Sequence, residues 1–223
     1  MSTIYLSETA NPLLIEYLNQ QGHIINIIKM SDITYNPVSS HPDIYMCSMG
    51  PGNPVFFGCP EKIGKKYPNN IIYNAACTGQ FFIHNTKYTD SQLLKYAESS
   101  QTLEIIHVPQ GYTKCSTLII DENSIITSDI GIYNSCYSKL DVLLIEKGHI
   151  KLQGFDYGFI GGASGRIGDT IIFNGDITKH PDYEKIAAFI ESRNLKIKYF
   201  TEYPLEDIGS IIHTPFQEAQ SYY

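Results

Sequence analysis

The stretch CTGQFFIHNTKYTDSQLLKYAESSQTLEIIHV, residues 77–108, contains one complete copy of the unit that decides the fold. It begins with the small residue Cys77, and an apolar run at 81–84 follows whose aromatic and β-branched residues favour a strand. A helical pattern over 90–98 and a second apolar run over 103–108 complete it. Such a unit cannot bury its apolar face alone, so further copies are expected in the chain.

Five small thiol or hydroxyl residues each precede an apolar run and are separated by 30, 38, 49 and 46 positions. We refer to them as the marker residues: Cys47, Cys77, Cys115, Ser164 and Ser210. After Ser164 the unit recurs as a predicted strand over 170–174, a helix over 181–192 and a strand over 195–200. A repeat of this kind predicts that equivalent positions gather around one axis.

The unit after Cys115 is a variant with a hairpin, a short helix and a strand, predicted over 117–127, 133–139 and 141–145. The unit after Cys47 is the shortest, and its only helical signal is one turn over 61–65. Both keep the order of elements, which supports a common module.

The last marker, Ser210, is followed by only a few residues, and the rest of its module is found at the other end of the chain. Residues 3–6, 11–21 and 24–30 read as strand, helix and strand. The fifth module is therefore predicted to be split between the termini, whose pairing closes a ring and removes exposed sheet edges. The predicted fold is α/β, with five pseudo-symmetric ββαβ-type modules around a central channel and residues 1–223 forming one domain.

Composition limits the classes of function. At 223 residues, with 43% hydrophobic and 17% charged residues, the chain can bury one substantial core. A net charge of −7 without a basic cluster argues against nucleic acid, and no apolar run approaches membrane-spanning length. The five cysteines lack C-x-x-C spacing and no secretion signal is recognised, so we expect free thiols and a cytoplasmic location. We expect no metal and no cofactor, since His84, His107 and His180 share no ligand spacing.

Three strings carry a resemblance to a known superfamily: QGYTKCST (110–117), GFDYGFIGGASG (154–165) and PLEDIGSI (204–211). With them, the chain resembles an uncharacterised clostridial-type bacterial family of the guanidino-group-modifying enzymes. The resemblance spans almost the whole sequence and implies the pentein, or α/β-propeller, fold. It also implies a site for a small polar molecule in the central channel.

The resemblance also implies residues for catalysis, and this chain departs from them. Characterised enzymes of the superfamily use a cysteine near the C-terminus, a mid-chain histidine and carboxylates that hold a cationic substrate. Here Thr214 stands at the matching position of the cysteine and Asp156 at that of the histidine. A deiminase with the standard mechanism is therefore not expected.

Pseudo-symmetry allows the nucleophile to be displaced to Cys115, where Lys114 would lower the pKa of the thiol. His213 could then act as a base near pH 7, although a lone histidine on a strand is more often structural, and Asp156 is the candidate for the role of the missing mid-chain histidine. The alternative is that Cys115 is a small buried core residue and Lys114 projects away from it.

Two further features suggest substrate binding. The string GGASGRIGD at 161–169 could gather backbone N–H groups around an anion, with Ser164 and Arg166 as further contacts. It could equally be a tight turn with Arg166 solvated or paired to Asp169. Asp207 and Ser210 should lie near the ring centre, where the carboxylate could hold a cationic group or merely form a turn.

Three hypotheses on function follow from these residues. The first is a cysteine-dependent hydrolase or transferase acting on an amidine or amide through Cys115. The second is a non-catalytic ring that binds a small polar ligand with Arg166 and Asp207. The third is a protein-interaction module, a role that the pentein architecture also has in a ribosome anti-association factor.

Overall fold

The computed structural model describes residues 2–36 and 38–215, and in this part of the chain it contains five small β-sheets. Four sheets have three strands, in the order β14–β1–β2, β5–β6–β7, β8–β9–β10 and β11–β12–β13. The fifth is the two-stranded sheet β3–β4. The strands are β1 (Ser2–Ser7), β2 (Ile24–Ile28), β3 (Met46–Ser48), β4 (Val55–Phe57), β5 (Ala76–Cys77), β6 (Phe81–His84), β7 (Glu104–His107), β8 (Thr117–Asp121), β9 (Ser124–Thr127), β10 (Asp141–Leu144), β11 (Ser164–Ile167), β12 (Thr170–Phe173), β13 (Lys196–Lys198) and β14 (Ile212–Pro215).

The three-stranded sheets share one connectivity. In each, the first pair of strands is antiparallel, the second pair is parallel, and a helix joins the two parallel strands. These helices are α1 (Pro12–Gln20), α3 (Ser91–Ser99), α5 (Ile130–Cys136) and α6 (Tyr183–Glu191). The two-stranded sheet has only the antiparallel pair, followed by the single 3₁₀ turn η2 (Pro60–Lys62). The predicted ββαβ order is thus present four times, and the predicted short module is the incomplete one.

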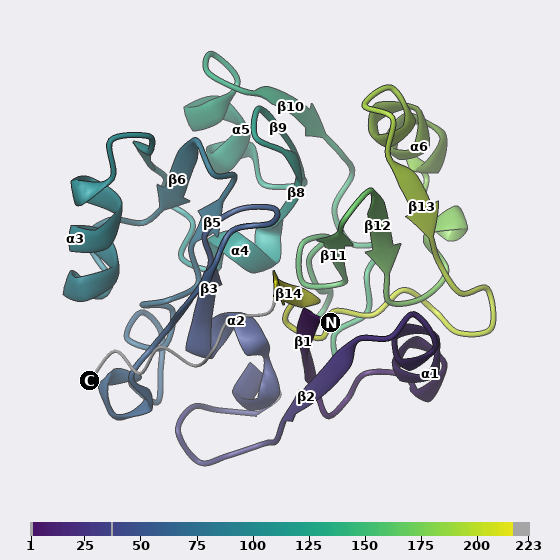
Figure 1. The fold of residues 1–223 in the computed structure, drawn as a ribbon, viewed down its shortest axis with the longest axis horizontal. Coiled ribbons are helices and arrows are strands. Elements are labelled where there is room, and N and C mark those ends of the chain that lie inside the picture. The colour runs from purple at the N-terminus through teal and green to yellow at the C-terminus, as the bar shows by residue number, and fades with distance from the viewer. Residues whose placement is uncertain (1, 37, 216–223) are drawn as a thin grey trace.

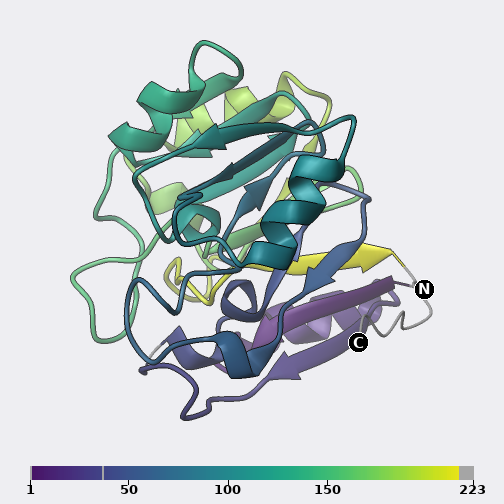
Figure 2. The same ribbon diagram turned by 90° about the vertical axis from the view of Figure 1, so that its left-hand side faces the viewer.

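The two ends of the described chain pair with each other. Strand β14 runs antiparallel to β1, with Ile4 opposite His213, and the two strands lie side by side in Figure 2. Strand β1 then pairs in parallel with β2 after helix α1. The prediction of a module split between the termini is confirmed.

The five sheets contact one another in a closed cycle. The first strand of each sheet contacts the first strand of the next, in the order β14, β3, β5, β8, β11 and back to β14. Figure 1 shows these strands near the middle of the molecule and the helices α1, α3, α5 and α6 at its periphery. The first strand of every sheet therefore lies in one central region of the molecule.

The hydrophobic core follows the same arrangement. It consists of five clusters of buried side chains, and each cluster joins two neighbouring sheets. Members of one cluster that come from two neighbouring sheets are Leu118 and Phe173, Cys47 and Phe82, Ile83 and Ile125, Leu6 and Ile172, and Met46 and Ile212. Burial of apolar surface, at roughly 25 cal/mol per Å², therefore stabilises every contact of the cycle.

Local signals explain where the helices begin and end. Asn11 caps α1, since its Oδ1 accepts a hydrogen bond from the Leu13 N–H, and Pro12 occupies the first turn, where its missing N–H has no cost. Gly22 ends the helix with φ +82°, a conformation that glycine adopts without strain.

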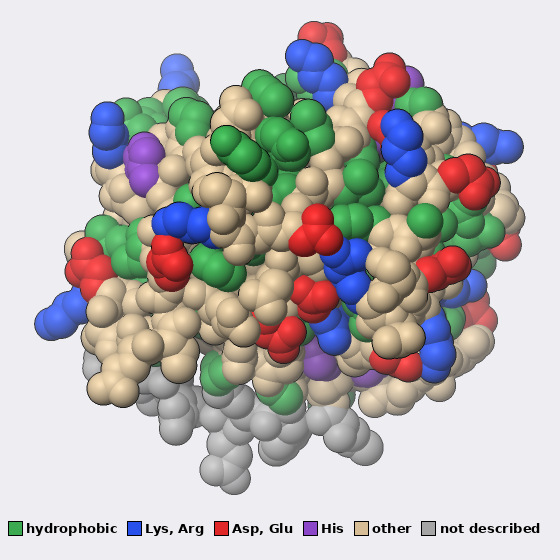
Figure 3. Space-filling view, turned by 90° about the horizontal axis from the view of Figure 1, so that it is seen from above, with side chains coloured by type: hydrophobic (Ala, Val, Ile, Leu, Met, Phe, Trp, Pro, Cys, Tyr) green, Lys and Arg blue, Asp and Glu red, His purple; other side chains and the backbone are tan. Residues whose placement is uncertain are grey.

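No helix in the described ranges combines the length and apolar character that a bilayer crossing requires. On the face shown in Figure 3, acidic and basic side chains are interspersed.

Candidate functional site

A cluster of buried polar residues lies where the chain enters the first strands of the sheets. Two short helices contribute to it: α2 (Pro42–Tyr45) precedes β3, and α4 (Thr113–Ser116) precedes β8. We call it the central cluster, and its members are His41, Asp43, Asn74, Lys114, Cys115, Asp207 and Ser210. None is more than 8% exposed, so every charge among them is held away from bulk water.

Asp43 accepts hydrogen bonds from two other members of the central cluster. Its Oδ2 accepts hydrogen bonds from the Cys115 thiol (2.9 Å) and from the Ser210 hydroxyl (2.8 Å). Its Oδ1 is buried and has no hydrogen-bond partner among the described residues. Burial raises the pKa of Asp43, and the nearby His41 opposes this effect.

Asn74 fixes the helix that carries Cys115. Its Oδ1 accepts from the backbone N–H groups of Lys114 (2.9 Å) and Cys115 (3.3 Å), and its Nδ2 lies 3.4 Å from the thiol. The Asn74 amide also donates to the Asp43 carbonyl at 3.2 Å. Helix α4 is thereby held against α2.

The Lys114 side chain joins α4 to the segments that precede β11 and β14. Its Nζ donates to the Ser210 hydroxyl (3.0 Å) and to the Gly161 carbonyl (3.3 Å). Burial lowers the pKa of Lys114, while the Coulombic attraction of Asp43 opposes that shift. The ammonium group is thus directed to the opposite side of the ring and not to the neighbouring thiol.

This arrangement corrects the prediction of a Cys115 thiolate activated by Lys114. The thiol donates to Asp43, and its burial, together with the negative charge of Asp43, raises the pKa of Cys115 well above its usual value. The predicted helpers are also elsewhere: Asp156 is exposed in the loop before β11, and His213 lies on β14 with its ring packed edge-on against His23. Cys115 is therefore a protonated, buried thiol at neutral pH, as in the alternative interpretation.

Thiol labelling tests this assignment. Cys59 is exposed, whereas Cys47, Cys77, Cys115 and Cys136 are buried. In the folded protein we expect a mild electrophile at pH 7 to modify one thiol rapidly, and we expect Cys59→Ser to abolish that fast phase. Mass spectrometry of the labelled peptides identifies the site, and preferential modification of Cys115 would show that it is reactive.

A small pocket opens on the other side of Lys114. Its volume is about 40 Å³, and it is lined by residues from the first strand of every sheet. These are Ser48 on β3, Cys77 on β5, Leu118 on β8, Gly165 on β11 and Ile212 on β14. The pocket therefore lies at the centre of the cycle of sheets, where the sequence predicts a channel.

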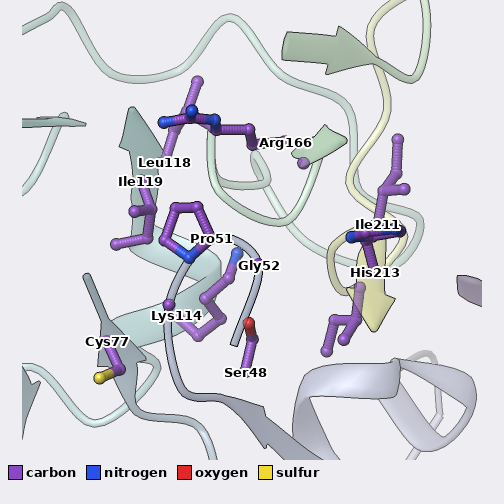
Figure 4. Close-up of a pocket in the computed structure, with 13 residues that line it drawn as sticks. Ser48, Pro51, Gly52, Cys77, Lys114, Leu118, Ile119, Arg166, Ile211 and His213 are labelled. Carbon is purple, nitrogen blue, oxygen red and sulfur yellow. The ribbon is translucent and has the colours of Figure 1, made fainter. Parts of the chain in front are cut away.

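The lysine, arginine and histidine side chains give this central pocket a basic lining. Lys114, Arg166 and His213 surround it, as Figure 4 shows, and no Asp or Glu lines it among the described residues. Arg166 is held by its Nε, which donates to the Gly168 carbonyl at 2.9 Å, and by its Nη1, which donates to the Ile120 carbonyl. Burial, and then the charge of His23, lower the pKa of His213, so this ring is neutral at pH 7.

The glycine-rich string at 161–169 does not form the predicted anion-binding loop. The Gly162 N–H donates to the Cys115 carbonyl (2.8 Å) and the Ala163 N–H donates to the Phe159 carbonyl (3.0 Å). The glycines instead permit close approach, because a Cβ on Gly162 would lie 2.0 Å from Asp207 Oδ1. The turn interpretation holds only for the two ends of the string, because Ser164–Ile167 forms strand β11, and Asp169 pairs with Lys196 at 2.7 Å and not with Arg166.

The remaining predicted residues are also placed. Asp207 is buried in the central cluster, where Oδ1 accepts from the Gly209 N–H and Oδ2 from the Phe159 N–H, both at 2.9 Å. Ser164 is buried, donates to the Ile160 carbonyl at 2.6 Å and does not line the central pocket. Ser210 adopts φ +78°, an uncommon conformation for a residue other than glycine, and contacts Asp43 and Lys114.

Sequence reasoning missed His41, Asp43 and Asn74. A signal was present for Asp43, since it precedes the marker Cys47 by four residues much as Asp207 precedes Ser210 by three. The repeat could have identified Asp43 as a central carboxylate, whereas neither histidine nor asparagine recurs at the equivalent positions.

One comparison with known proteins gives a match. A family model described as a family of unknown function (DUF6873) matches residues 53–212, which is well over half of the chain. No curated protein and no solved structure matches it.

Proposed function

The chain belongs to the DUF6873 family, a family of unknown function, and from its own geometry we propose that it is a pentein-type ring that binds a small carboxylate-bearing molecule in the central pocket. The five-membered cycle of first strands and the repeated ββαβ connectivity support the pentein assignment.

The proposal rests on one observation, the positive charge of the side chains that line the pocket. The chain has a formal net charge of −7, yet the pocket is lined by Lys114 and Arg166, and no Asp or Glu among the described residues lines it. Because Arg166 Nε and Nη1 are already bonded to carbonyl groups, the guanidinium is held in one orientation. A positioned guanidinium with a nearby ammonium group is suited to a carboxylate.

The size of the pocket limits the ligand group. A single water needs roughly 10–15 Å³ of cavity, so a cavity of about 40 Å³ holds only a few non-hydrogen atoms. A carboxylate group matches this space, whereas a nucleotide does not fit, and the basic lining disfavours a cationic guanidinium group.

Lys114 links binding in the pocket to the central cluster. Because burial lowers the pKa of Lys114, an anion beside it favours its protonated form. Anion affinity should therefore fall at alkaline pH, as Lys114 loses its proton at a lower pH than an exposed lysine would. Below the ordinary pKa of histidine, protonation of His213 should add to the affinity.

The test uses the only other arginine of the chain as its control. We expect titration with acetate, followed by ¹H–¹⁵N NMR, to give saturable shifts at the residues that line the central pocket. Arg166→Gln should weaken acetate binding at least tenfold, because the charge-assisted bonds to a carboxylate are lost. Arg193→Gln should leave the affinity unchanged, since Arg193 contacts Asp141 and Ser124 away from the pocket. Equal weakening by both variants, or shifts that do not saturate, would disprove the proposal.

A cysteine-dependent hydrolase is the weaker candidate. Its best support is the 2.9 Å hydrogen bond from Cys115 to Asp43, which gives the thiol a proton acceptor. However, Cys115 is 3% exposed and does not line the central pocket, so a substrate cannot reach the sulfur in this conformation.

A further inference from the structure

Three potential metal ligands meet inside the central cluster. His41, Asp43 and Cys115 each offer one donor atom, and these atoms lie within 4.8 Å of one another. All three residues are buried. We propose that they bind a divalent cation of the Zn²⁺ class, at a site whose ligands do not line the anion pocket.

Unpartnered polar atoms point to a missing ligand. Asp43 Oδ1 and His41 Nδ1 are both buried and make no hydrogen bond within the described part of the chain. Leaving such an atom unpaired costs about 1–3 kcal/mol, and more when the group is charged. Here two such atoms belong to two of the three potential metal ligands. A cation in the space between the donor atoms would provide the missing partner for both.

The types of the three donor atoms indicate which cation the site would bind. Imidazole nitrogen, thiolate sulfur and carboxylate oxygen are the ligands of Zn²⁺, whereas Mg²⁺ and Ca²⁺ prefer oxygen alone. Three protein ligands leave one position open, which is the arrangement of zinc sites that also hold water. Asp207 Oδ1 lies 3.9 Å from the same His41 Nδ1, so a second carboxylate places negative charge beside the proposed site.

Charge balance also favours a divalent ion. Binding requires the Cys115 thiol to release its proton to solvent as the metal–sulfur bond forms. The thiolate, Asp43 and Asp207 then oppose the single charge of Lys114, which leaves two net negative charges in a buried region. A divalent cation neutralises them, and this removes the cost of burying unpaired charge.

Cobalt gives a direct readout of the sulfur ligand. We expect the full-length protein to bind one equivalent of Co²⁺ with a thiolate-to-metal charge-transfer band in the near ultraviolet, and to release one proton per ion from Cys115. Added Zn²⁺ should displace the cobalt and remove the band. A wild-type protein without this band overturns the proposal, whatever the variants do.

Matched variants locate the ion. Cys115→Ser should abolish the charge-transfer band, and Asp43→Asn should weaken binding at least tenfold. Cys47→Ser, a buried cysteine outside the group of three, and Cys59→Ser, an exposed thiol beside Glu61, should both bind as wild type. A band that survives Cys115→Ser but is lost in Cys59→Ser would place the metal at the surface and refute the site. If Cys115→Ser does not fold, Asp43→Asn decides, because unchanged Co²⁺ affinity in that variant contradicts the proposal.

Arg166→Gln separates this inference from the proposed function. It should bind Co²⁺ normally, because Arg166 belongs to the central pocket and not to the group of three ligands. Normal Co²⁺ binding in this variant, which is expected to lose acetate affinity, would therefore distinguish failure of the anion pocket from failure of the metal site.

Discussion

Gly161→Ala should lower the free energy of unfolding by about 3 kcal/mol or more, which makes it one of the two largest effects that we expect. A Cβ at this position would lie 2.3 Å from the Lys114 carbonyl oxygen and 2.3 Å from that of Thr117. Both are backbone atoms, one in α4 and the other in the first residue of β8, so neither can rotate away. Relief requires the segment before β11 to separate from α4, which disturbs the boundary between two sheets and the central cluster together.

Gly168→Ala is the control for this experiment. Gly168 lies in the turn between β11 and β12 with φ +58°, and nothing lies within 4 Å of its added Cβ. We therefore expect only the cost of a left-handed conformation, about 1 kcal/mol. Urea unfolding followed by circular dichroism compares the two variants. Equal destabilisation would show that the close approach at Gly161 is not what limits side-chain size there.

Lys114→Met should destabilise the protein by about 3–5 kcal/mol, the usual cost of removing one partner from a buried ionic group. Methionine retains the length of the side chain but leaves Asp43 and Asp207 without their buried cation. It also removes the two donors to Ser210 and Gly161. Lys147→Met, at an exposed position, should change stability by no more than about 0.5 kcal/mol.

The pH dependence of Lys114→Met has a definite sign. Burial already raises the pKa of Asp43, and loss of the ammonium should raise it further. Since the folded state then binds a proton at a pH where the unfolded state does not, the variant should recover stability as the pH falls through the raised pKa of Asp43.

A second substitution tests whether charge is the cause. Asp43→Asn should restore part of the stability that Lys114→Met removes, with a coupling energy that a double-mutant cycle measures. Strictly additive effects at pH 7 would contradict a charge interaction between Lys114 and Asp43.

Much of the fold was predictable because its signals are local. The run at 81–84 and the run at 103–108 are recognisable by composition, and they form β6 and β7 of one module. Pairing of the chain ends followed from the incomplete last module, and the β1–β14 ladder bears it out. Local composition could not predict where each marker residue lies relative to the start of its strand. Cys47 and Cys77 lie in strands, whereas Cys115 lies in α4, two residues before β8 starts at Thr117.

The central cluster could not be predicted from spacing, because its contacts join distant parts of the chain. Asp43 and Cys115 are 72 residues apart, and Asp43 and Ser210 are 167 apart. The adjacency of Lys114 and Cys115 suggested an interaction between them, but the two side chains bind different partners. Nearest neighbours in sequence were therefore a poor guide to the site, whereas the repeat correctly placed Asp207 and Ser210 near its centre.

The central claim is that an anion binds where the five sheets meet, and a crystal of the protein soaked in bromide and recorded at the bromine absorption edge tests it most directly. The account predicts an anomalous peak inside the pocket, within reach of Lys114 and Arg166, which disappears when acetate is added in excess. Bromide peaks confined to the outer surface, with none between those two side chains, would contradict it.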